Sequence, residues 1–247
     1  MTEHFLLFAH RGAKDVAPEN TLSAFRKAIQ LQADGVEFDV LVTKDGVPVV
    51  SHNNNLSELT NGRCCVHSSS YKEIEHLDAG SHFSAHYKGE RLPTLVQVLH
   101  LFSGKNLLIN IEIKREANIS KKHLDAIFDI ITHFGEEKNV IISSFSLRIM
   151  MYVKKRIPHI KRAVLFRSGP FSTFRAKLRC RIIKPFSLHP PFSALSRRLV
   201  RFAKMKGIFI YSWTINTEAD IKKCKAMHID GIMTDSISLS REFLKSH

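Results

Sequence analysis

Short apolar runs alternate with helix-like segments along most of the 247-residue chain. Such runs are typical of strands buried on both faces, and the segments between them carry apolar residues at helical spacing. Because parallel strands need a crossover helix to connect them, the alternation predicts an α/β protein built on a parallel sheet. The predicted strands lie at about residues 5–9, 35–42, 107–113, 140–145, 162–167, 182–188, 208–213 and 230–235.

Eight strand–helix units in 247 residues fit a single (β/α)8 TIM barrel, whose usual length is ~250 residues. A doubly wound open sheet shows the same alternation, so the pattern alone leaves both folds open. Residues 53–91 depart from the alternation, because they are rich in Ser, His and Gly and show no clean period. We predict that they form an insertion after the second strand region, with a short helix at Tyr71–Leu77, within one domain that spans 1–247.

Charged side chains follow a strict parity on two of the predicted strands. Glu37 and Asp39 point to one face of the second strand, and Glu112 shares a face with Asn110 and Lys114 on the third. If these strands are neighbours, about 4.8 Å apart, the three carboxylates meet and need a cation between them. We therefore predict a site for one divalent cation, Mg²⁺ or Ca²⁺. The alternative is a half-solvated strand whose carboxylates face water.

Two histidines, His10 and His52, each end a short apolar run. The unperturbed pKa of histidine, ~6.5, allows one imidazole to accept a proton and another to donate one near neutral pH. Beside a cation site, such a pair suggests general acid–base catalysis of phosphoryl chemistry. The chain holds 14 histidines, so only the placement at strand ends distinguishes these two.

Several short motifs occur together in a fixed order: HRGAKDVAPENTLSAF, GVEFDV, TKDGVPVVSH, LTNG, LDAG, LPTL, NIEIK, SWTIN and DGIMTD. In these motifs the chain resembles the glycerophosphodiester phosphodiesterases essentially from end to end. The resemblance implies a (β/α)8 barrel with a small insertion after the second strand region. It also implies metal-dependent hydrolysis of glycerophosphodiesters to glycerol 3-phosphate and an alcohol.

The resemblance further implies a role for individual residues. The acid–base pair would be His10 and His52, and Glu37, Asp39 and Glu112 would hold the metal ion. Arg11 and Lys114 would bind the phosphate, and Trp213 would line the glycerol pocket. Glu19 would orient Arg11 or His10, and Asn20 would cap the first helix.

Two positions depart from the family's usual pattern. Asn53 follows His52 where an aspartate is usual, and Glu58 stands where an arginine is usual. The first change removes a carboxylate beside the implied acid–base histidine, so the orientation or pKa of His52 can differ from the family's. His189 and Asp235 also fall at strand ends, and we interpret both as supporting or structural residues.

The net charge of +14 is concentrated in one part of the chain. Residues 138–217 contain no Asp or Glu, and 17 Lys and Arg fall within 145–206. Such a basic surface attracts anions, namely phosphate substrates, lipid head groups or nucleic acid. A barrel that binds nucleic acid without catalysis is a rival interpretation. Against it, no known nucleic-acid module is present, and aromatic residues alternate with basic ones in only one short segment.

That segment, residues 168–184, has two interpretations. Phe171, Phe174, Leu178 and Ile182 recur at spacings of three and four among basic residues, which is typical of an amphipathic helix on an anionic membrane. The interpretation that we favour is a barrel helix whose apolar stripe points inward and whose charges are solvated. Membrane contact would instead favour a lysophospholipase D-like or cyclising activity on lysophospholipids.

The remaining features lead us to expect a cytoplasmic protein. No run of 18 or more apolar residues is present, and the first residues lack the basic region of a cleaved signal. The four cysteines show no metal-binding spacing and fit reduced thiols in a cytosol. The expected partner is a small-molecule glycerophosphodiester, and nothing in the sequence indicates an oligomeric state.

Overall fold

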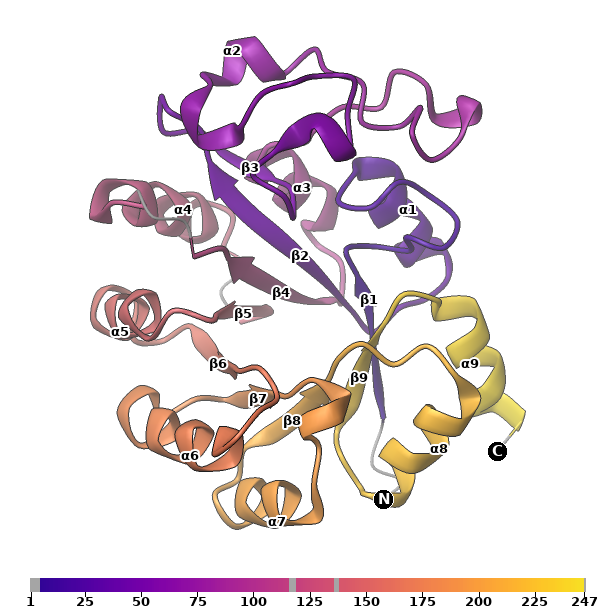
Figure 1. Ribbon diagram of the computed structural model, residues 1–247, viewed down its shortest axis with the longest axis vertical. Helices are drawn as coiled ribbons and strands as arrows, with labels where there is room; N and C mark the ends of the chain where they lie inside the picture. The colour runs from indigo at the N-terminus through magenta and orange to yellow at the C-terminus, as the bar shows by residue number, and fades with distance from the viewer. Residues whose placement is uncertain (1–4, 116–118, 136–137, 247) are drawn as a thin grey trace.

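The computed structural model describes residues 5–115, 119–135 and 138–246 (Figure 1). Eight parallel strands close into a barrel, because the first strand pairs with the second and also with the last. The fold is therefore the predicted (β/α)8 barrel and not an open sheet. In chain order, the barrel strands are β1 (Leu6–His10), β2 (Gly35–Val42), β4 (Leu108–Ile113), β5 (Val140–Ser144), β6 (Lys161–Leu165), β7 (Ser187–His189), β8 (Phe209–Ser212) and β9 (Gly231–Thr234).

Helices connect the strands and cover the outside of the barrel (Figure 1). Most begin after a Ser or Thr whose side chain accepts a backbone N–H of the first turn, which satisfies a donor that the helix leaves free. The predicted domain, 1–247, includes residues 1–4 and 247, which lie outside the described residues. The barrel helices are α1 (Leu22–Gln30), α3 (Leu95–Phe102), α4 (Lys121–His133), α5 (Leu147–Arg156), α6 (Ser172–Ile183), α7 (Arg197–Met205), α8 (Glu218–Ala226) and α9 (Ile237–Ser246).

The interior of the barrel contains its own apolar cluster, in which the rings of Phe8 and Tyr211 pack with their centroids 4.8 Å apart. Gly35 on β2 makes room for one of them, because a Cβ at this position would lie 2.4 Å from the Phe8 ring on β1. This packing leaves the carboxyl ends of the strands for polar side chains. The buried residues of the cluster are Phe8, Ile141, Ala163, Tyr211 and Met233.

Between β2 and α3 the chain leaves the barrel and forms a compact excursion (top of Figure 1). It opens with β3 (Pro48–Val50), which runs antiparallel to β2 after a turn at Asp45-Gly46. The carboxylate of Asp78 accepts three backbone N–H groups and holds a later loop together. The predicted helix at Tyr71–Leu77 ends earlier, at Ile74. The short elements are η1 (Leu56–Glu58), η2 (Val66–Ser68), α2 (Tyr71–Ile74) and η3 (Ala85–Tyr87).

One strand boundary predicted in the second half of the chain is wrong. The strand expected at 182–188 begins only at Ser187, because α6 continues to Ile183 and ends at Lys184, whose φ of 51° is left-handed. Further along, α7 starts at Arg197, after the short η4 (Phe192–Ala194), because Ser196 provides its cap.

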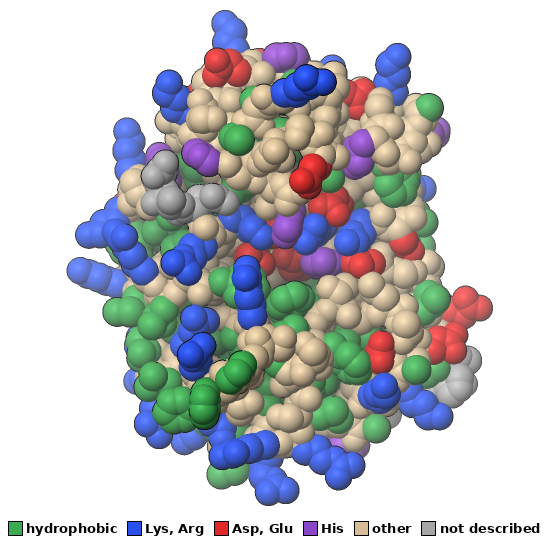
Figure 2. All heavy atoms as spheres, in the orientation of Figure 1, with side chains coloured by type: hydrophobic (Ala, Val, Ile, Leu, Met, Phe, Trp, Pro, Cys, Tyr) green, Lys and Arg blue, Asp and Glu red, His purple; other side chains and the backbone are tan. Residues whose placement is uncertain are grey.

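Helix α6 belongs to the barrel, but the predicted direction of its apolar stripe is wrong. Phe171, Phe174 and Leu178 are 75%, 67% and 48% exposed, and the buried side chains of the helix are Ala176, Cys180 and Ile183. Figure 2 shows hydrophobic side chains among Lys and Arg on this lower left part of the molecule. No helix among the described residues combines the length and the apolar character that a membrane span needs.

Candidate active site

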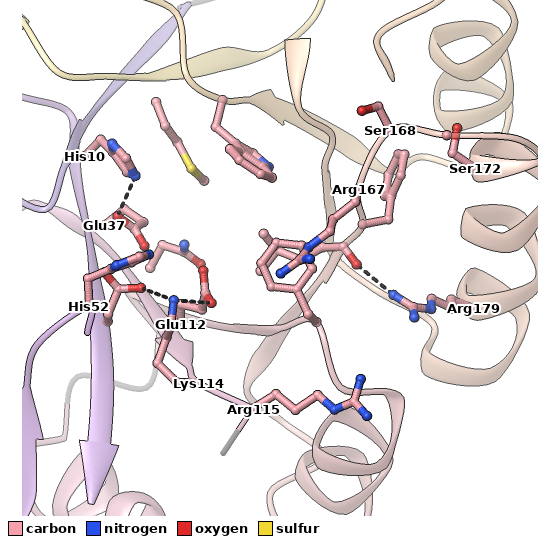
Figure 3. Close-up of a pocket in the computed structure, with 18 of the residues that line it drawn as sticks. His10, Glu37, His52, Glu112, Lys114, Arg115, Arg167, Ser168, Ser172 and Arg179 are labelled. Atoms are coloured by element: carbon pink, nitrogen blue, oxygen red, sulfur yellow. Dashed lines mark hydrogen bonds and ion pairs between the residues drawn. The ribbon is translucent and has the colours of Figure 1, made fainter. Parts of the chain in front are cut away.

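Two neighbouring strands, β2 and β4, bring the predicted carboxylates together beside His10 of β1 (Figure 3). In the sheet, β2 lies between β1 and β4, so that Glu37 is opposite His10 on one side and Asn110 on the other. Two residues further along β2, Asp39 is opposite Glu112. Each of the three carboxylates offers an oxygen, and these oxygens lie within 4.8 Å of one another. The strand parity that the sequence predicted thus produces a single buried cluster.

The carboxylates of this cluster repel one another. Burial and the charges of Asp39 and Glu112 raise the pKa of Glu37 well above its usual range. Burial and the charge of Asp39 raise the pKa of Glu112 to about 7. Although burial also raises the pKa of Asp39, the charges of Lys114 and Arg11 bring it below the usual value. Buried oxygen donors of this number and spacing are compatible with a divalent cation.

Two cations face the three carboxylates. Lys114 Nζ lies 3.1 Å from Asp39 Oδ1 and 3.3 Å from Glu112 Oε1. Arg11 Nε lies 3.5 Å from Asp39 Oδ2, and Arg11 Nη1 donates a hydrogen bond of 2.8 Å to Glu19 Oε1. Glu19 therefore contacts Arg11, one of the two residues that it was expected to orient. Both cations line the same cavity as the carboxylates.

The role predicted for Asn20 as the cap of the first helix is wrong. Thr21 is the cap, because its backbone is extended and its hydroxyl accepts the Ala24 N–H, whereas the backbone of Asn20 is left-handed, with a φ of 57°. The side chain of Asn20 instead donates to Asp39 Oδ2 at 3.2 Å. Asn20 therefore holds one member of the carboxylate cluster in place.

His10 is oriented by a residue to which the sequence assigned no chemistry. Its Nδ1 lies 2.6 Å from Asp235 Oδ1, and its Nε2 lies 3.9 Å from Glu37 Oε2. Burial raises the pKa of Asp235, but hydrogen bonds from His10 and Asn216 and the charges of His10 and Lys14 outweigh it and lower this pKa to about 2. A carboxylate can only accept, so Nδ1 of His10 carries a proton. In the sequence, Asp235 stood out only by its position at the end of the last strand and in the DGIMTD motif.

The two departures from the family pattern contact each other beside His52. Asn53 Nδ2 donates to Glu58 Oε2 at 2.6 Å, and this fixes which way the Asn53 amide points. Its Oδ1 then faces His52 Nδ1 at 2.5 Å, where it can only accept, so this nitrogen carries the proton. Burial, the largest influence, lowers the pKa of His52 below its usual value, although the charge of Asp39 opposes the effect.

Trp213 stands at the end of β8 and lines the cavity. Its indole Nε1 donates to the His189 carbonyl at 2.9 Å, and its ring meets Phe145 edge-to-face at a centroid distance of 6.0 Å. The side chain of His189 is completely buried, and burial lowers its pKa to about 3, so this imidazole is neutral. His189 is thus part of the support of Trp213.

The cavity that contains these groups has a volume of about 660 Å³. Figure 2 shows carboxylates, imidazoles and cations gathered at the centre of this face. The cavity continues to a second wall, whose residues were not predicted from the sequence to be part of the site. It is formed by the end of β4, the segment between β6 and α6, and α6 itself (Figure 3). The polar residues of this wall are Arg115, Arg167, Ser168, Ser172, Arg175 and Arg179.

Fold and site together define a (β/α)8-barrel enzyme, because the carboxyl ends of the strands, where such barrels carry their chemistry, hold a buried acidic cluster flanked by imidazoles and cations. More particularly, the chain belongs to the glycerophosphoryl diester phosphodiesterase family, whose model matches residues 10–239.

Individual relatives agree with this assignment. A glycerophosphodiester phosphodiesterase from Caldanaerobacter subterraneus is 37% identical over 230 residues, which cover 93% of each chain. A phosphodiesterase structure from Oleispira antarctica, in complex with the product sn-glycerol-3-phosphate, superimposes with a TM-score of 0.91 and 26% identity, over 97% of this chain and 96% of that one. A lysophospholipase D from Homo sapiens is 26% identical over 268 residues, or 96% of this chain and 85% of the relative.

Proposed function

We propose that this protein hydrolyses glycerophosphodiesters to glycerol 3-phosphate and an alcohol, with one divalent cation, Mg²⁺ or Ca²⁺, held by Glu37, Asp39 and Glu112. The observation that supports this proposal is the convergence of these three carboxylates within 4.8 Å in a cavity that His10 and His52 also line. The match to the family and the names of its relatives support the substrate class. We further propose one barrel domain, with residues 53–91 as an insertion in it.

The residues of the cavity suit a phosphodiester. When bound, a divalent cation would supply positive charge for the phosphate oxygens and stabilise the charge that develops on them. Arg11 and Lys114 would bind the same phosphate, because both are buried enough to make strong charge-assisted hydrogen bonds and both line the cavity. Trp213 would line the space for the glycerol part.

The two imidazoles would move the protons. One removes a proton from the nucleophile, which is water or the 2-hydroxyl of the substrate glycerol, and the other donates a proton to the leaving alkoxide as the P–O bond breaks. Each ring is held at Nδ1, by Asp235 for His10 and by Asn53 for His52. In each case Nε2 is the nitrogen left for proton transfer.

The test is release of glycerol 3-phosphate from glycerophosphodiesters, measured during titration with Mg²⁺ or Ca²⁺ after treatment with a chelator. Activity should depend on the added cation, and Glu112→Gln should abolish that response. His10→Ala and His52→Ala should each lower turnover by roughly 10²–10⁴. His100→Ala, an exposed histidine on α3, is the matched control and should leave turnover unchanged. Full activity of the chelator-treated enzyme, of His10→Ala or of His52→Ala would reject the proposed mechanism.

A second candidate is a lysophospholipase D-like or cyclising activity on lysophospholipids at anionic membranes. One observation favours it: the exposed Phe171 lies between Pro170 and Ser172, both of which line the cavity, so an apolar surface borders the mouth of the site. Product analysis separates the candidates. Lysophosphatidate or a cyclic phosphate from a lysophospholipid would support the second candidate, and glycerol 3-phosphate from deacylated substrates alone would exclude it.

A further inference from the structure

The second wall of the cavity is positively charged and has no acidic partner among the described residues. Its four arginines are Arg115, Arg167, Arg175 and Arg179, and no described carboxylate makes an ion pair with any of them. The only described acidic residues that line the cavity are Glu37, Asp39 and Glu112, which already face Arg11 and Lys114. We refer to these four arginines as the arginine wall.

Two of these side chains are held in place by the protein. Arg167 lies over the ring of Phe145, with its guanidinium carbon 5.4 Å from the ring centroid. Arg179 donates from Nη1 to the Leu165 carbonyl at 2.9 Å, which leaves its other N–H groups available (Figure 3). Such anchoring lowers the entropy cost of binding an anion.

The surroundings of the arginine wall keep its charge unbalanced. Residues 138–217, which supply three of the four arginines, contain no Asp or Glu. The amino terminus of α6, where Ser172 lines the cavity, adds the positive end of a helix dipole to the same wall. Burial and the charge of Arg175 lower the pKa of Arg179, as expected for like charges that no carboxylate neutralises.

The cavity also has room for more than glycerol 3-phosphate. Its volume of about 660 Å³ falls within the ~300–1,000 Å³ of sites that enclose drug-sized ligands. The carboxylate cluster, Arg11 and Lys114 account for the phosphate that is cleaved. A diester has one other part beyond its glycerol phosphate, namely the alcohol that leaves.

We propose that the arginine wall binds this alcohol and that the alcohol of the preferred substrate carries an anionic group, either a second phosphate or a carboxylate. This inference rests on the proposed function and goes beyond it by assigning the substrate class. Arginine suits the role because its planar fork of N–H donors matches phosphate and carboxylate oxygens. A cationic alcohol such as choline would meet repulsion at the same place.

The experiment compares kcat/KM for substrates that differ in the charge of the alcohol. Glycerophosphoglycerol has a neutral alcohol, its terminal phosphate ester an anionic one, and glycerophosphocholine a cationic one; glycerophosphoserine tests a carboxylate. The wild type should prefer the phosphate ester over glycerophosphoglycerol by about tenfold or more, since one charge-assisted hydrogen bond is worth this much. Glycerophosphocholine should be the poorest substrate.

The variant Arg167→Gln/Arg175→Gln should bring the anionic-to-neutral ratio close to one. Arg181→Gln removes a charge from the same helix but outside the cavity, so it is the matched control and should keep the wild-type ratio. An equal loss on all substrates in the double variant would overturn the inference, because the arginines would then bind the part that all substrates share. Lack of any preference in an active wild type would overturn it too.

A separate outcome would contradict the proposed function itself: the wild type releases glycerol 3-phosphate from none of the substrates. In that case, calorimetric titration of the chelator-treated protein measures binding to the arginine wall without turnover. The phosphate ester should bind more tightly than glycerophosphoglycerol to the wild type, and equally to the double variant. Equal binding of both compounds to the wild type would reject an anion subsite.

Discussion

Asn53 and Glu58 compensate for each other beside His52. An aspartate next to this histidine would accept its Nδ1 proton directly; here an amide does so, and a carboxylate one step further out fixes the amide. Because an amide can rotate and present its NH₂ group, Asn53 alone would not specify which nitrogen of His52 carries the proton. Glu58 removes this ambiguity, since it can only accept.

The variant Glu58→Ala should therefore lower kcat and leave KM nearly unchanged. Loss of one hydrogen bond to a charged group, ~1–2 kcal/mol, corresponds to a roughly 5- to 30-fold loss of turnover. Glu58→Gln is the matched variant, because its side-chain carbonyl still accepts from Asn53, and it should recover most of the activity. The measurement is kcat as a function of pH. Equal activity of all three proteins would show that Asn53 is held by other means.

At the scale of elements, α6 combines two surfaces. Its small side chains, Ala176 and Cys180, pack onto the barrel, and its phenylalanines are left at the surface among Lys and Arg. Exposed apolar side chains with basic neighbours are the composition of helices that lie on anionic membranes. We expect this face to contact such a membrane while the adjoining cavity takes up substrate.

Vesicle sedimentation tests this expectation for α6. The wild type should sediment with anionic vesicles at low salt, less at high salt, and little with neutral vesicles. Phe171→Ser/Phe174→Ser should weaken binding by about tenfold or more, since burying each phenyl ring contributes ~1.5–3 kcal/mol. Val96→Ser, at an exposed apolar position on α3, is the control. Equal sedimentation of the double variant and the wild type would rule out this face.

At the scale of the whole molecule, the carboxylate cluster opposes folding when no cation is bound. The pKa of Glu112 rises on folding to about 7, so the folded protein holds a proton that the unfolded chain releases above about pH 4.5. In chelator, stability should therefore fall as the pH rises from about 4.5 to 7 and then level off. This loss of stability arises because folding places three carboxylates close together.

Addition of Mg²⁺ or Ca²⁺ should reverse this loss. At a hundredfold excess over Kd the cation should raise Tm by roughly 5–10 °C at neutral or higher pH. The rise should be smaller near pH 5, where protons occupy the carboxylates. Thermal unfolding with and without chelator at the two pH values measures the effect, and Glu112→Gln should reduce it. An identical shift in that variant would place the cation elsewhere.

Strand parity was sufficient for the acidic cluster, because strand side chains alternate and neighbouring parallel strands keep register. It did not separate a barrel from an open sheet, and only the resemblance to the family favoured the barrel. It was insufficient for the contact of His10 with Asp235, which are 225 residues apart and share no local pattern. It also failed at α6, where both faces carry apolar residues and periodicity cannot say which face is buried. The buried face carries the small side chains of Ala176 and Cys180, which allow this helix to pack closely against the barrel.

The contact of His10 with Asp235 joins two parts of the chain that are 225 residues apart. A ribosome adds residues in order, so β1 is made long before β9. The imidazole of His10 therefore has no carboxylate partner while most of the barrel strands are being made. A nascent chain has its acidic cluster encoded early, yet its His10 is oriented only after β9 has been made and has paired with β1.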